Sequence, residues 1–332
     1  MTNPNARPVN LGATGPKVFP IGLGCMGMSG MYGPPDDEES VATIQAAIDR
    51  GVNLIDTGDF YGMGHNELIV GRALRGRRDR AVVSVKFGAL RGPDGAWLGF
   101  DARPAAVKAF AAYSLKRLGV DCLDVYRPAR LDAHVPIEDT VGAIVDLIRA
   151  GYVRHVGLSE VGAETIRRAA KVHPIVDLQI EYALVTRAPE AKIFPTLAEV
   201  GASATLYGVY SRGLLAGKGP TGHRGDMRAH LPRFAGANRA QNDDVVARVK
   251  RFADERRMTP GQVALAWVLA KQPTLVPIVG ARTRAQLEDA LGALERPLSA
   301  DDVAELERLV PPDAVAGTRY GEEQMKHLDS ER

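Results

Sequence analysis

Three residues that could carry proton chemistry lie in or just after two apolar runs of the sequence. Asp56 ends "VNLID", Tyr61 follows in "TGDFYG", and Lys86 lies near the end of "AVVSVKF". A tyrosine with its usual pKa of about 10 is a poor acid at neutral pH. A neighbouring ammonium group would lower that pKa, and a carboxylate would hold the ammonium in place. Such a phenol can protonate a carbonyl oxygen while a hydride reaches its carbon.

These residues also have ordinary structural interpretations. A lysine in a strand is often a surface residue, and Lys86 paired with Asp56 could be a salt bridge without further function. The run around Lys86 is apolar, so the strand should be buried on both sides and an unpaired ammonium would be costly. We expect Asp59 to be a turn or cap residue.

The overall composition is that of a globular protein, with 45% hydrophobic and 25% charged residues. The formal net charge of +2, spread over mixed-charge segments, argues against a nucleic-acid partner. Cys25 and Cys122 imply no disulfide framework, and no His-x-x-x-His pair suggests a metal site. There is no signal-like or membrane-spanning apolar run. We expect a cytoplasmic protein with a small-molecule substrate and no membrane partner; the sequence does not define its oligomeric state.

Short apolar runs alternate with helical patterns along the chain. We expect strands at residues 19–25, 52–56, 81–87, 123–127, 153–159, 176–182, 203–209 and 275–280. The helical segments, with apolar residues three and four apart, include residues 37–51, 67–76, 104–119, 137–151, 163–172 and 283–294. Eight such units predict an α/β fold, a closed (β/α)8 TIM barrel. A doubly wound open sheet is the alternative, but "GLGCMGMSG" matches its glycine signature weakly.

We expect residues 1–332 to form a single barrel domain with three additions. Residues from about 8 to 20 suit a hairpin that closes the bottom of the barrel. Residues from about 216 to 242 are rich in glycine and charge and predict a long functional loop after strand seven. The tail from about 311 to 332 should lie over one face. Active sites in such barrels lie at the C-terminal ends of the strands. The trio of Asp56, Tyr61 and Lys86 should therefore lie at the same mouth of the barrel.

Because these motifs occur in the same order and spacing as in the aldo-keto reductase family, the chain resembles that family, and especially its subgroup of pyridoxal and other aldehyde reductases. "NLIDTGDFYG" resembles the signature of strand two, and "VVSVKFG" supplies the family's lysine. The resemblance extends from "IGLGCMGMS" to "PIVGARTRAQLEDALGAL". It implies NADPH-dependent reduction of aldehydes or ketones to alcohols, with the cofactor bound without a Rossmann domain. Asp56, Tyr61 and Lys86 match the catalytic positions.

One catalytic position departs from the family pattern. The family has a histidine before an arginine after strand four, whereas "DVYRPARLD" places Ala129 before Arg130. In the family this histidine orients the carbonyl, so we expect a reduced or specialised reductase rather than an inactive one. Alanine leaves room for a bulkier substrate or a water. Arg127 or Arg130 could reach the mouth instead, and His134 falls in the next loop.

The resemblance also implies the contacts of the cofactor. Ser159, Glu160 and Gln179 match the partners of the nicotinamide carboxamide, with glutamate in place of the usual asparagine, and Tyr207 matches the aromatic residue that stacks on the ring. The pyrophosphate segment is Gly208, Val209, Tyr210, Arg212, Gly213 and Leu214. The adenosine side is Gly280, Arg282, Arg284, Gln286 and Asp289, where either arginine would pair with a 2′-phosphate. Candidates for the substrate pocket are Met26, Ala129 and Trp97, together with Met28, Tyr32 and the loop near Phe234.

Two other functions remain open. One is a regulatory or redox-sensing subunit that binds NADPH and turns over slowly, like the barrel subunits of potassium channels. The other is reduction of an activated carbon–carbon double bond, which in the family accompanies a glutamate at the histidine position.

Overall fold

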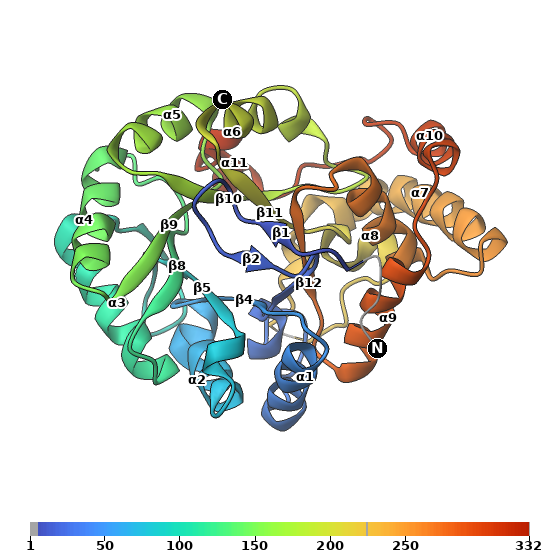
Figure 1. Ribbon diagram of the computed structural model, residues 1–332. Helices are drawn as coiled ribbons and strands as arrows, with labels where there is room; N and C mark the ends of the chain where they lie inside the picture. The colour runs from blue at the N-terminus through green and yellow to red at the C-terminus, as the bar shows by residue number, and fades with distance from the viewer. Residues whose placement is uncertain (1–5, 224, 332) are drawn as a thin grey trace.

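Eight parallel strands close into a barrel in the computed structural model, which describes residues 6–223 and 225–331 (Figure 1). Each strand overlaps one of those predicted, so the predicted (β/α)8 barrel is confirmed. In order around the barrel, the strands are β3 (Gly22–Gly24), β4 (Leu54–Gly58), β5 (Val82–Phe87), β8 (Leu123–Pro128), β9 (Val153–Ser159), β10 (Ile175–Glu181), β11 (Ser203–Tyr207) and β12 (Val276–Gly280).

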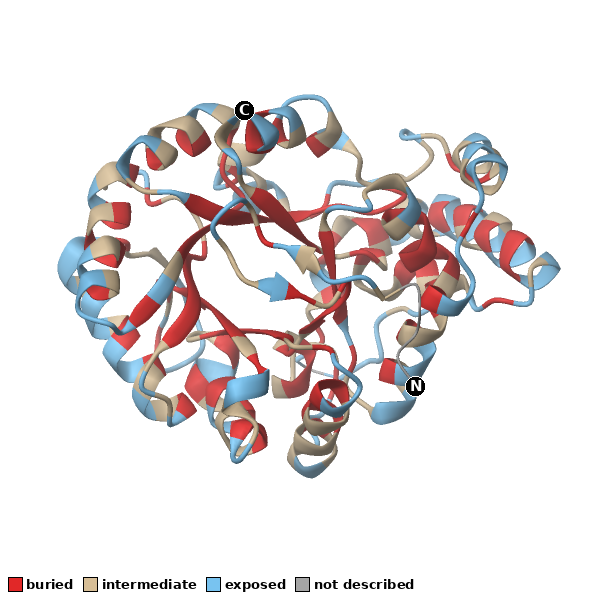
Figure 2. Ribbon diagram, viewed as in Figure 1, coloured by how far each residue is buried: buried red, intermediate tan, exposed pale blue. Residues whose placement is uncertain are grey.

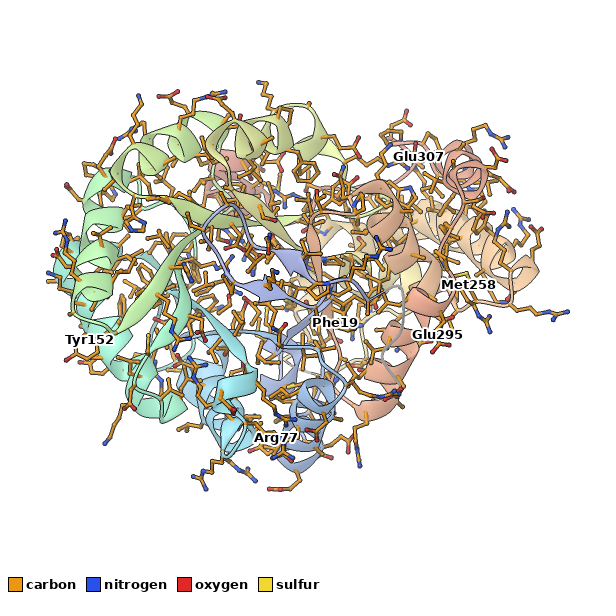
Figure 3. All side chains as sticks on the ribbon, viewed as in Figure 1. Phe19, Arg77, Tyr152, Met258, Glu295 and Glu307 are labelled. Atoms are coloured by element: carbon orange, nitrogen blue, oxygen red, sulfur yellow. The ribbon has the colours of Figure 1, made fainter. Side chains whose placement is uncertain are left out.

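Helices surround the barrel and bury the sides that face it (Figure 2). They are α1 (Asp37–Asp49), α2 (His65–Leu74), α3 (Pro104–Leu118), α4 (Ile137–Arg149), α5 (Ala163–Val172), α6 (Ile193–Val200), α7 (Gly236–Glu255), α8 (Pro260–Lys271), α9 (Arg284–Leu291), α10 (Ala300–Leu309) and α11 (Glu322–Lys326). Side chains of the outer elements, such as Arg77 and Tyr152, lie at the periphery (Figure 3).

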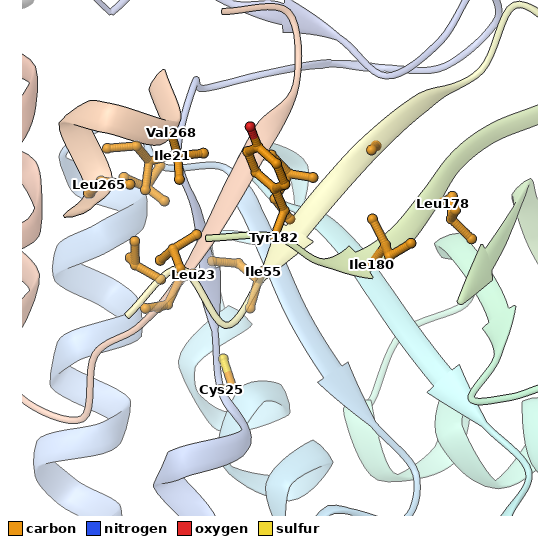
Figure 4. Close-up of a cluster of buried hydrophobic side chains, with 14 of the residues drawn as sticks. Ile21, Leu23, Cys25, Ile55, Leu178, Ile180, Tyr182, Leu265 and Val268 are labelled. Carbon is orange, nitrogen blue, oxygen red and sulfur yellow. The ribbon is translucent and has the colours of Figure 1, made fainter. Parts of the chain in front are cut away.

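A continuous apolar layer joins the barrel to its helices. Ile21 and Leu23 on the first strand segment lie beside Leu265 and Val268 of α8, with Ile55 of β4 nearby (Figure 4). All five side chains are buried, and their packing fixes α8 against the barrel wall. Because α8 is buried along most of its length, it lacks the two-sided pattern by which an amphipathic helix is recognised.

The predicted N-terminal hairpin is present as β1 (Val9–Asn10) and β2 (Lys17–Val18), which pair antiparallel. Leu11 and Val18 join a second apolar cluster with the interior residues Leu54, Val125 and Val276. These interior residues lie towards the N-terminal ends of their strands. The hairpin therefore closes the bottom of the barrel and leaves the opposite end as the mouth.

The predicted long loop over residues 216–242 is wrong at its C-terminal end, because α7 begins at Gly236. The polar sequence of α7 hides its helical pattern, and its buried positions include Asn242. The side-chain amide of Asn242 donates to the carbonyls of Arg233 (2.9 Å) and Ala316 (3.0 Å), so a residue typical of loops is held inside a helix. The sequence also gave no sign of the short antiparallel pair β6 (Ala89–Arg91) and β7 (Trp97–Phe100).

The middle of the barrel holds a buried ion pair. Arg127 is fully buried and donates to Asp177 (2.9 Å), and also to Thr205 (3.2 Å) and Ser84 (2.9 Å). Gly157 makes room for it, because a Cβ there would lie 2.9 Å from Asp177 Oδ1 and 3.2 Å from Arg127 Cζ. The expectation that Arg127 could reach the mouth is therefore wrong: its guanidinium is used inside the barrel.

Replacing Arg127 by methionine should destabilise the protein by about 3–5 kcal/mol, because it leaves the carboxylate of Asp177 buried without its ionic partner. Unfolding in urea would measure the change. The matched control is Arg167→Met, which breaks a half-exposed pair with Glu199 and should cost less than about 1 kcal/mol. Equal losses in the two variants would contradict a structural role for the buried pair.

Candidate active site

A cavity of about 660 Å³ opens at the mouth of the barrel, among the C-terminal ends of the strands. Its wall includes Asp56, Tyr61 and Lys86, which the sequence placed at one mouth. Asp56 lies in β4 and Lys86 in β5, and the pairing of Gly58 with Lys86 brings the two strand ends level. The cavity is thus built where parallel strands present alternate side chains inwards.

Asp56 is the centre of a buried polar cluster. Its carboxylate accepts hydrogen bonds from the Lys86 ammonium, from Ser84 Oγ (2.9 Å) and from Gln179 Nε2 (2.9 Å). Lys86 Nζ also donates to Gln179 Oε1 (2.8 Å). The ammonium lies 5.2 Å from the centre of the Tyr61 ring, so the predicted trio is brought together.

The electrostatics of Tyr61 differ from the expectation. Burial raises the pKa of Tyr61 well above 10, and the charge of Asp56 raises it further. Burial also lowers the pKa of Lys86, against the opposing effect of Asp56. The predicted lowering of the Tyr61 pKa is therefore wrong, because desolvation and the charge of Asp56 outweigh the lowering effect of Arg130. The proton donors of Lys86 are directed at Asp56 and Gln179. At neutral pH the phenol is protonated, which is the form that can donate a proton.

The loop after β4 fixes Tyr61 in place. Tyr61 begins the 3-10 turn η2 (Tyr61–Gly64), and the backbone N–H of Asp59 donates to the carbonyl of Lys86 (2.9 Å). The Asp59 carboxylate accepts from the N–H of Gly88 (3.3 Å), so Asp59 has the turn role that was expected. Asn66 was not predicted from the sequence. Its side chain accepts a hydrogen bond from Thr57 Oγ1 (2.7 Å) and donates one to the carbonyl of Cys25 (2.8 Å).

Ala129, where the resemblance implies a histidine in the family, is 3% exposed and lines the cavity. Arg130 lines it as well and donates to the carbonyl of Ala129 (2.6 Å) and to the hydroxyl of Tyr320 (3.3 Å). His134 is exposed and is not part of the cavity wall. Tyr320 was not predicted, because it lies in the tail and no motif links it to the barrel.

Most of the residues predicted to contact the cofactor or substrate line this cavity. They are Ser159, Gln179, Tyr207, Gly208, Val209, Tyr210, Arg212, Gly213, Gly280, Arg282, Gln286, Asp289, Met26 and Trp97, and Tyr32 joins them. Leu214 and Arg284 do not line it. Leu214 is buried in the protein interior, and Arg284 lies outside, paired with Glu39 (2.9 Å). Met28 is likewise a core residue. Phe234 is not in the wall, but other residues of the long loop are, namely Lys218, Gly219, Thr221, Met227 and Arg228.

Glu160 also lies outside the cavity wall, although it was predicted to contact the carboxamide. It is fully buried, and its two carboxylate oxygens accept from Arg319 (2.9 Å each), while Tyr207 OH (2.7 Å) and Ser330 Oγ (2.6 Å) donate to it as well. The backbone N–H of Glu181 adds another bond. The prediction is wrong because the carboxylate already has these partners: Glu160 anchors the C-terminal tail.

The chain belongs to the aldo-keto reductase family. Residues 20–311 match the model of the aldo/keto reductase family, which covers most of the chain. The enzyme is thus an oxidoreductase of the class that acts on carbonyl and alcohol groups, as predicted.

None of the helices in the described part of the chain has the length and apolar character needed to span a membrane.

Several relatives can be named. A probable aldo-keto reductase 1 of Glycine max is 39% identical over 329 residues, covering 96% of this chain and 93% of its own. The aldo-keto reductase yakc [NADP(+)] of Schizosaccharomyces pombe is 37% identical, covering 90% of this chain and 91% of its own.

Solved structures agree in fold. The glycerol dehydrogenase of Gluconobacter oxydans superposes with a TM-score of 0.82 at 28% identity, covering 95% of this chain and 99% of its own. An aldo/keto reductase of Klebsiella pneumoniae, solved with NADP and acetate, superposes with a TM-score of 0.72 at 26% identity. The match covers 93% of this chain and 99% of the Klebsiella pneumoniae chain.

Glu160 should make stability depend on pH. Burial raises the pKa of Glu160, but the hydrogen bonds and charge of Arg319 outweigh it and lower that pKa to about 2. The unfolded carboxyl group titrates at about 4.3. The stabilisation, roughly 3 kcal/mol, is therefore complete above the unfolded pKa and is lost as the pH falls towards 2.

The free energy of unfolding, measured by urea from about pH 6 to pH 3, should consequently fall less steeply in Glu160→Gln than in the wild type. Glu295→Gln, at an exposed site, is the control and should keep the wild-type slope. Parallel curves for the wild type and Glu160→Gln would show that Arg319 does not hold the carboxylate ionised.

Proposed function

We propose that this protein reduces the carbonyl group of a small aldehyde or ketone to an alcohol with NADPH, and that Tyr61 is the proton donor. The observation that carries the proposal is the buried cluster of Asp56, Lys86 and Tyr61 in the wall of the cavity. NADPH, when bound, supplies the hydride that adds to the carbonyl carbon. The carbonyl oxygen takes the phenolic proton of Tyr61, so the substrate gains two hydrogens in total.

Each member of the cluster has a separate task. Tyr61 is protonated in its buried position, so it enters the reaction as an acid. Loss of its proton leaves a phenolate close to the ammonium of Lys86, and their attraction lowers the cost of the transfer. Asp56 and Gln179 keep that ammonium in place through their hydrogen bonds. Gln179 therefore supports Lys86, whether or not it also contacts the carboxamide.

The cavity wall suits a dinucleotide with several phosphates. Lys218 and Arg282 line it and form no ion pair within the part of the chain described, although the Arg282 guanidinium donates to the carbonyls of Tyr32 (3.1 Å) and Pro34 (2.5 Å). Arg212 pairs with Glu181 (3.3 Å), and its buried Nε has no hydrogen-bond partner among the described residues. At Gly208, φ is +70° and a Cβ would lie 3.0 Å from Glu181 Cγ, so glycine is favoured in this part of the cavity wall. We infer that Arg212 and Lys218 hold phosphate oxygens and that Arg282 holds the 2′-phosphate.

The two other functions make different demands. A regulatory subunit would bind NADPH with little turnover, and a double-bond reductase would prefer enones to simple carbonyls. Both reductions need a proton as well as a hydride, but double-bond reduction in the family accompanies a glutamate at the position where this chain has Ala129, which favours the carbonyl reaction. A panel of aldehydes, ketones and enones, followed by NADPH oxidation, separates the three.

Tyr61→Phe should lower kcat for aldehyde reduction by about 10²–10⁴-fold, because it removes the acid but keeps the ring. The dissociation constant of NADPH, measured by fluorescence, should change less than about threefold. Tyr152→Phe removes a hydroxyl at a half-exposed surface position and is the control. Undiminished turnover in Tyr61→Phe would exclude Tyr61 as the proton donor.

Arg282→Ala should weaken NADPH binding by about 10-fold or more and leave NADH binding nearly unchanged, because only NADPH carries the 2′-phosphate. Titration of both cofactors measures the difference. Arg284→Ala is the matched control, since its side chain lies outside the cavity and pairs with Glu39. If Arg284→Ala causes the selective loss instead, the assignment of the two arginines is reversed.

A further inference from the structure

One of the phenols in the cavity wall has no role in the proposed function. Tyr320 comes from the C-terminal tail and lines the same wall as Tyr61 and Ala129. Arg130 connects it to the Ala129 position, because its guanidinium donates both to the carbonyl of Ala129 (2.6 Å) and to the hydroxyl of Tyr320 (3.3 Å). The tail thus brings a hydroxyl group to the part of the cavity where alanine leaves space.

The direction of the hydrogen bonds around Tyr320 follows from proton counting. Glu160 is ionised through its pairing with Arg319, so its carboxylate can only accept. Tyr207 OH lies 2.7 Å from Glu160 and must donate its only proton there. The hydroxyls of Tyr207 and Tyr320 are 2.9 Å apart, so in this contact Tyr320 is the donor. Arg130 can only donate, so it donates to the Tyr320 oxygen.

Cationic groups polarise this phenol. The Arg212 guanidinium lies 4.4 Å from the centre of the Tyr320 ring, and that of Arg130 lies 5.8 Å away. Burial and the carboxylates of Glu181 and Glu160 raise the pKa of Tyr320, but the two arginines outweigh them and the pKa is lowered. The pKa of Tyr61 moves the opposite way. Tyr61 and Tyr320, which line the same cavity, therefore differ in acidity.

Tyr320 has a proton that it can redirect. Its hydrogen bond to Tyr207 joins two neutral hydroxyl groups, whereas a carbonyl oxygen gains negative charge as it is reduced. Donors aimed at such a developing charge are worth more in the transition state than in the ground state. Arg130 remains bonded to the Tyr320 oxygen and strengthens its O–H as a donor.

We propose that Tyr320 is a further catalytic residue: its hydroxyl donates a hydrogen bond to the substrate carbonyl oxygen from the side of Ala129, while Tyr61 transfers the proton. This inference rests on the proposed function. Tyr320 keeps its own proton throughout, so no bond to hydrogen is broken there. Arg130 is the positioning residue of this pair, and the C-terminal tail supplies part of the active site.

The test compares Tyr320→Phe with the wild type for aldehyde reduction. The phenylalanine ring keeps the packing against Arg212 and lacks only the hydroxyl. We expect kcat to fall about 10²-fold, as for the loss of one donor to a developing oxyanion. The dissociation constant of NADPH should change less than about threefold. Tyr113→Phe, at a 58% exposed position, is the matched control and should keep wild-type kcat.

Acetate provides a second readout, because its carboxylate carries oxygen charge like that of the reacting carbonyl. In aldehyde reduction with NADPH, Tyr320→Phe should weaken competitive inhibition by acetate at least about fivefold. If Tyr320 had only a structural role, the inhibition constant of acetate and the dissociation constant of NADPH would change together.

Each other result has a definite meaning. Unchanged kcat and acetate inhibition in Tyr320→Phe, with Tyr61→Phe inactive, would overturn the role of Tyr320 and leave the proposed function intact. A loss confined to NADPH affinity would also overturn it, since Tyr320 would then act only on the orientation of Tyr207. A loss of about 10⁴-fold in Tyr320→Phe, together with a smaller loss in Tyr61→Phe, would make Tyr320 the acid rather than the second donor. Absence of any carbonyl turnover by the wild type would overturn both proposals.

Discussion

The ammonium group of Lys86 imposes the constraint on which the active site depends. It is buried at the end of an inner strand, where an unpaired charge would cost several kcal/mol. Asp56 compensates it, but a buried carboxylate needs further donors, which Ser84 and Gln179 provide. Ser84 in turn accepts from Arg127, whose charge requires Asp177. The need to compensate one charge therefore extends down the barrel axis as a single network.

This network separates the barrel interior into layers with different tasks. Near the hairpin the interior is apolar, with Leu54, Val125 and Val276 packed together. The Arg127 pair occupies the middle, and the Lys86 cluster lies at the mouth. Only the last layer faces the cavity. The polar groups below it hold the cluster on rigid strands rather than on loops, which favours precise geometry for proton transfer.

The barrel and the trio could be predicted from sequence, because both follow from local patterns. Alternating apolar strands and helices indicate the fold, and a lysine in an apolar strand indicates a partnered charge. Helices α7 and α8 were missed because one is mostly polar and the other is buried along most of its length. The predicted cofactor contact of Glu160 was wrong, and Tyr320 was not predicted, for another reason. Their roles depend on contacts between distant parts of the chain, and no spacing in the sequence reveals which tail residue meets which strand. The pKa direction of Tyr61 was also beyond sequence reasoning, because it depends on the depth of burial.

The contact between Glu160 and Arg319 has a consequence for the order of folding. The two residues are 159 positions apart, so their pairing closes a long loop of the chain. Before Arg319 arrives, the Glu160 carboxylate at the end of β9 must stay hydrated or take up a proton. Water can thus reach the end of β9 until the tail docks. We expect this docking to follow the assembly of the strands, because it closes a long loop and therefore carries an entropic cost.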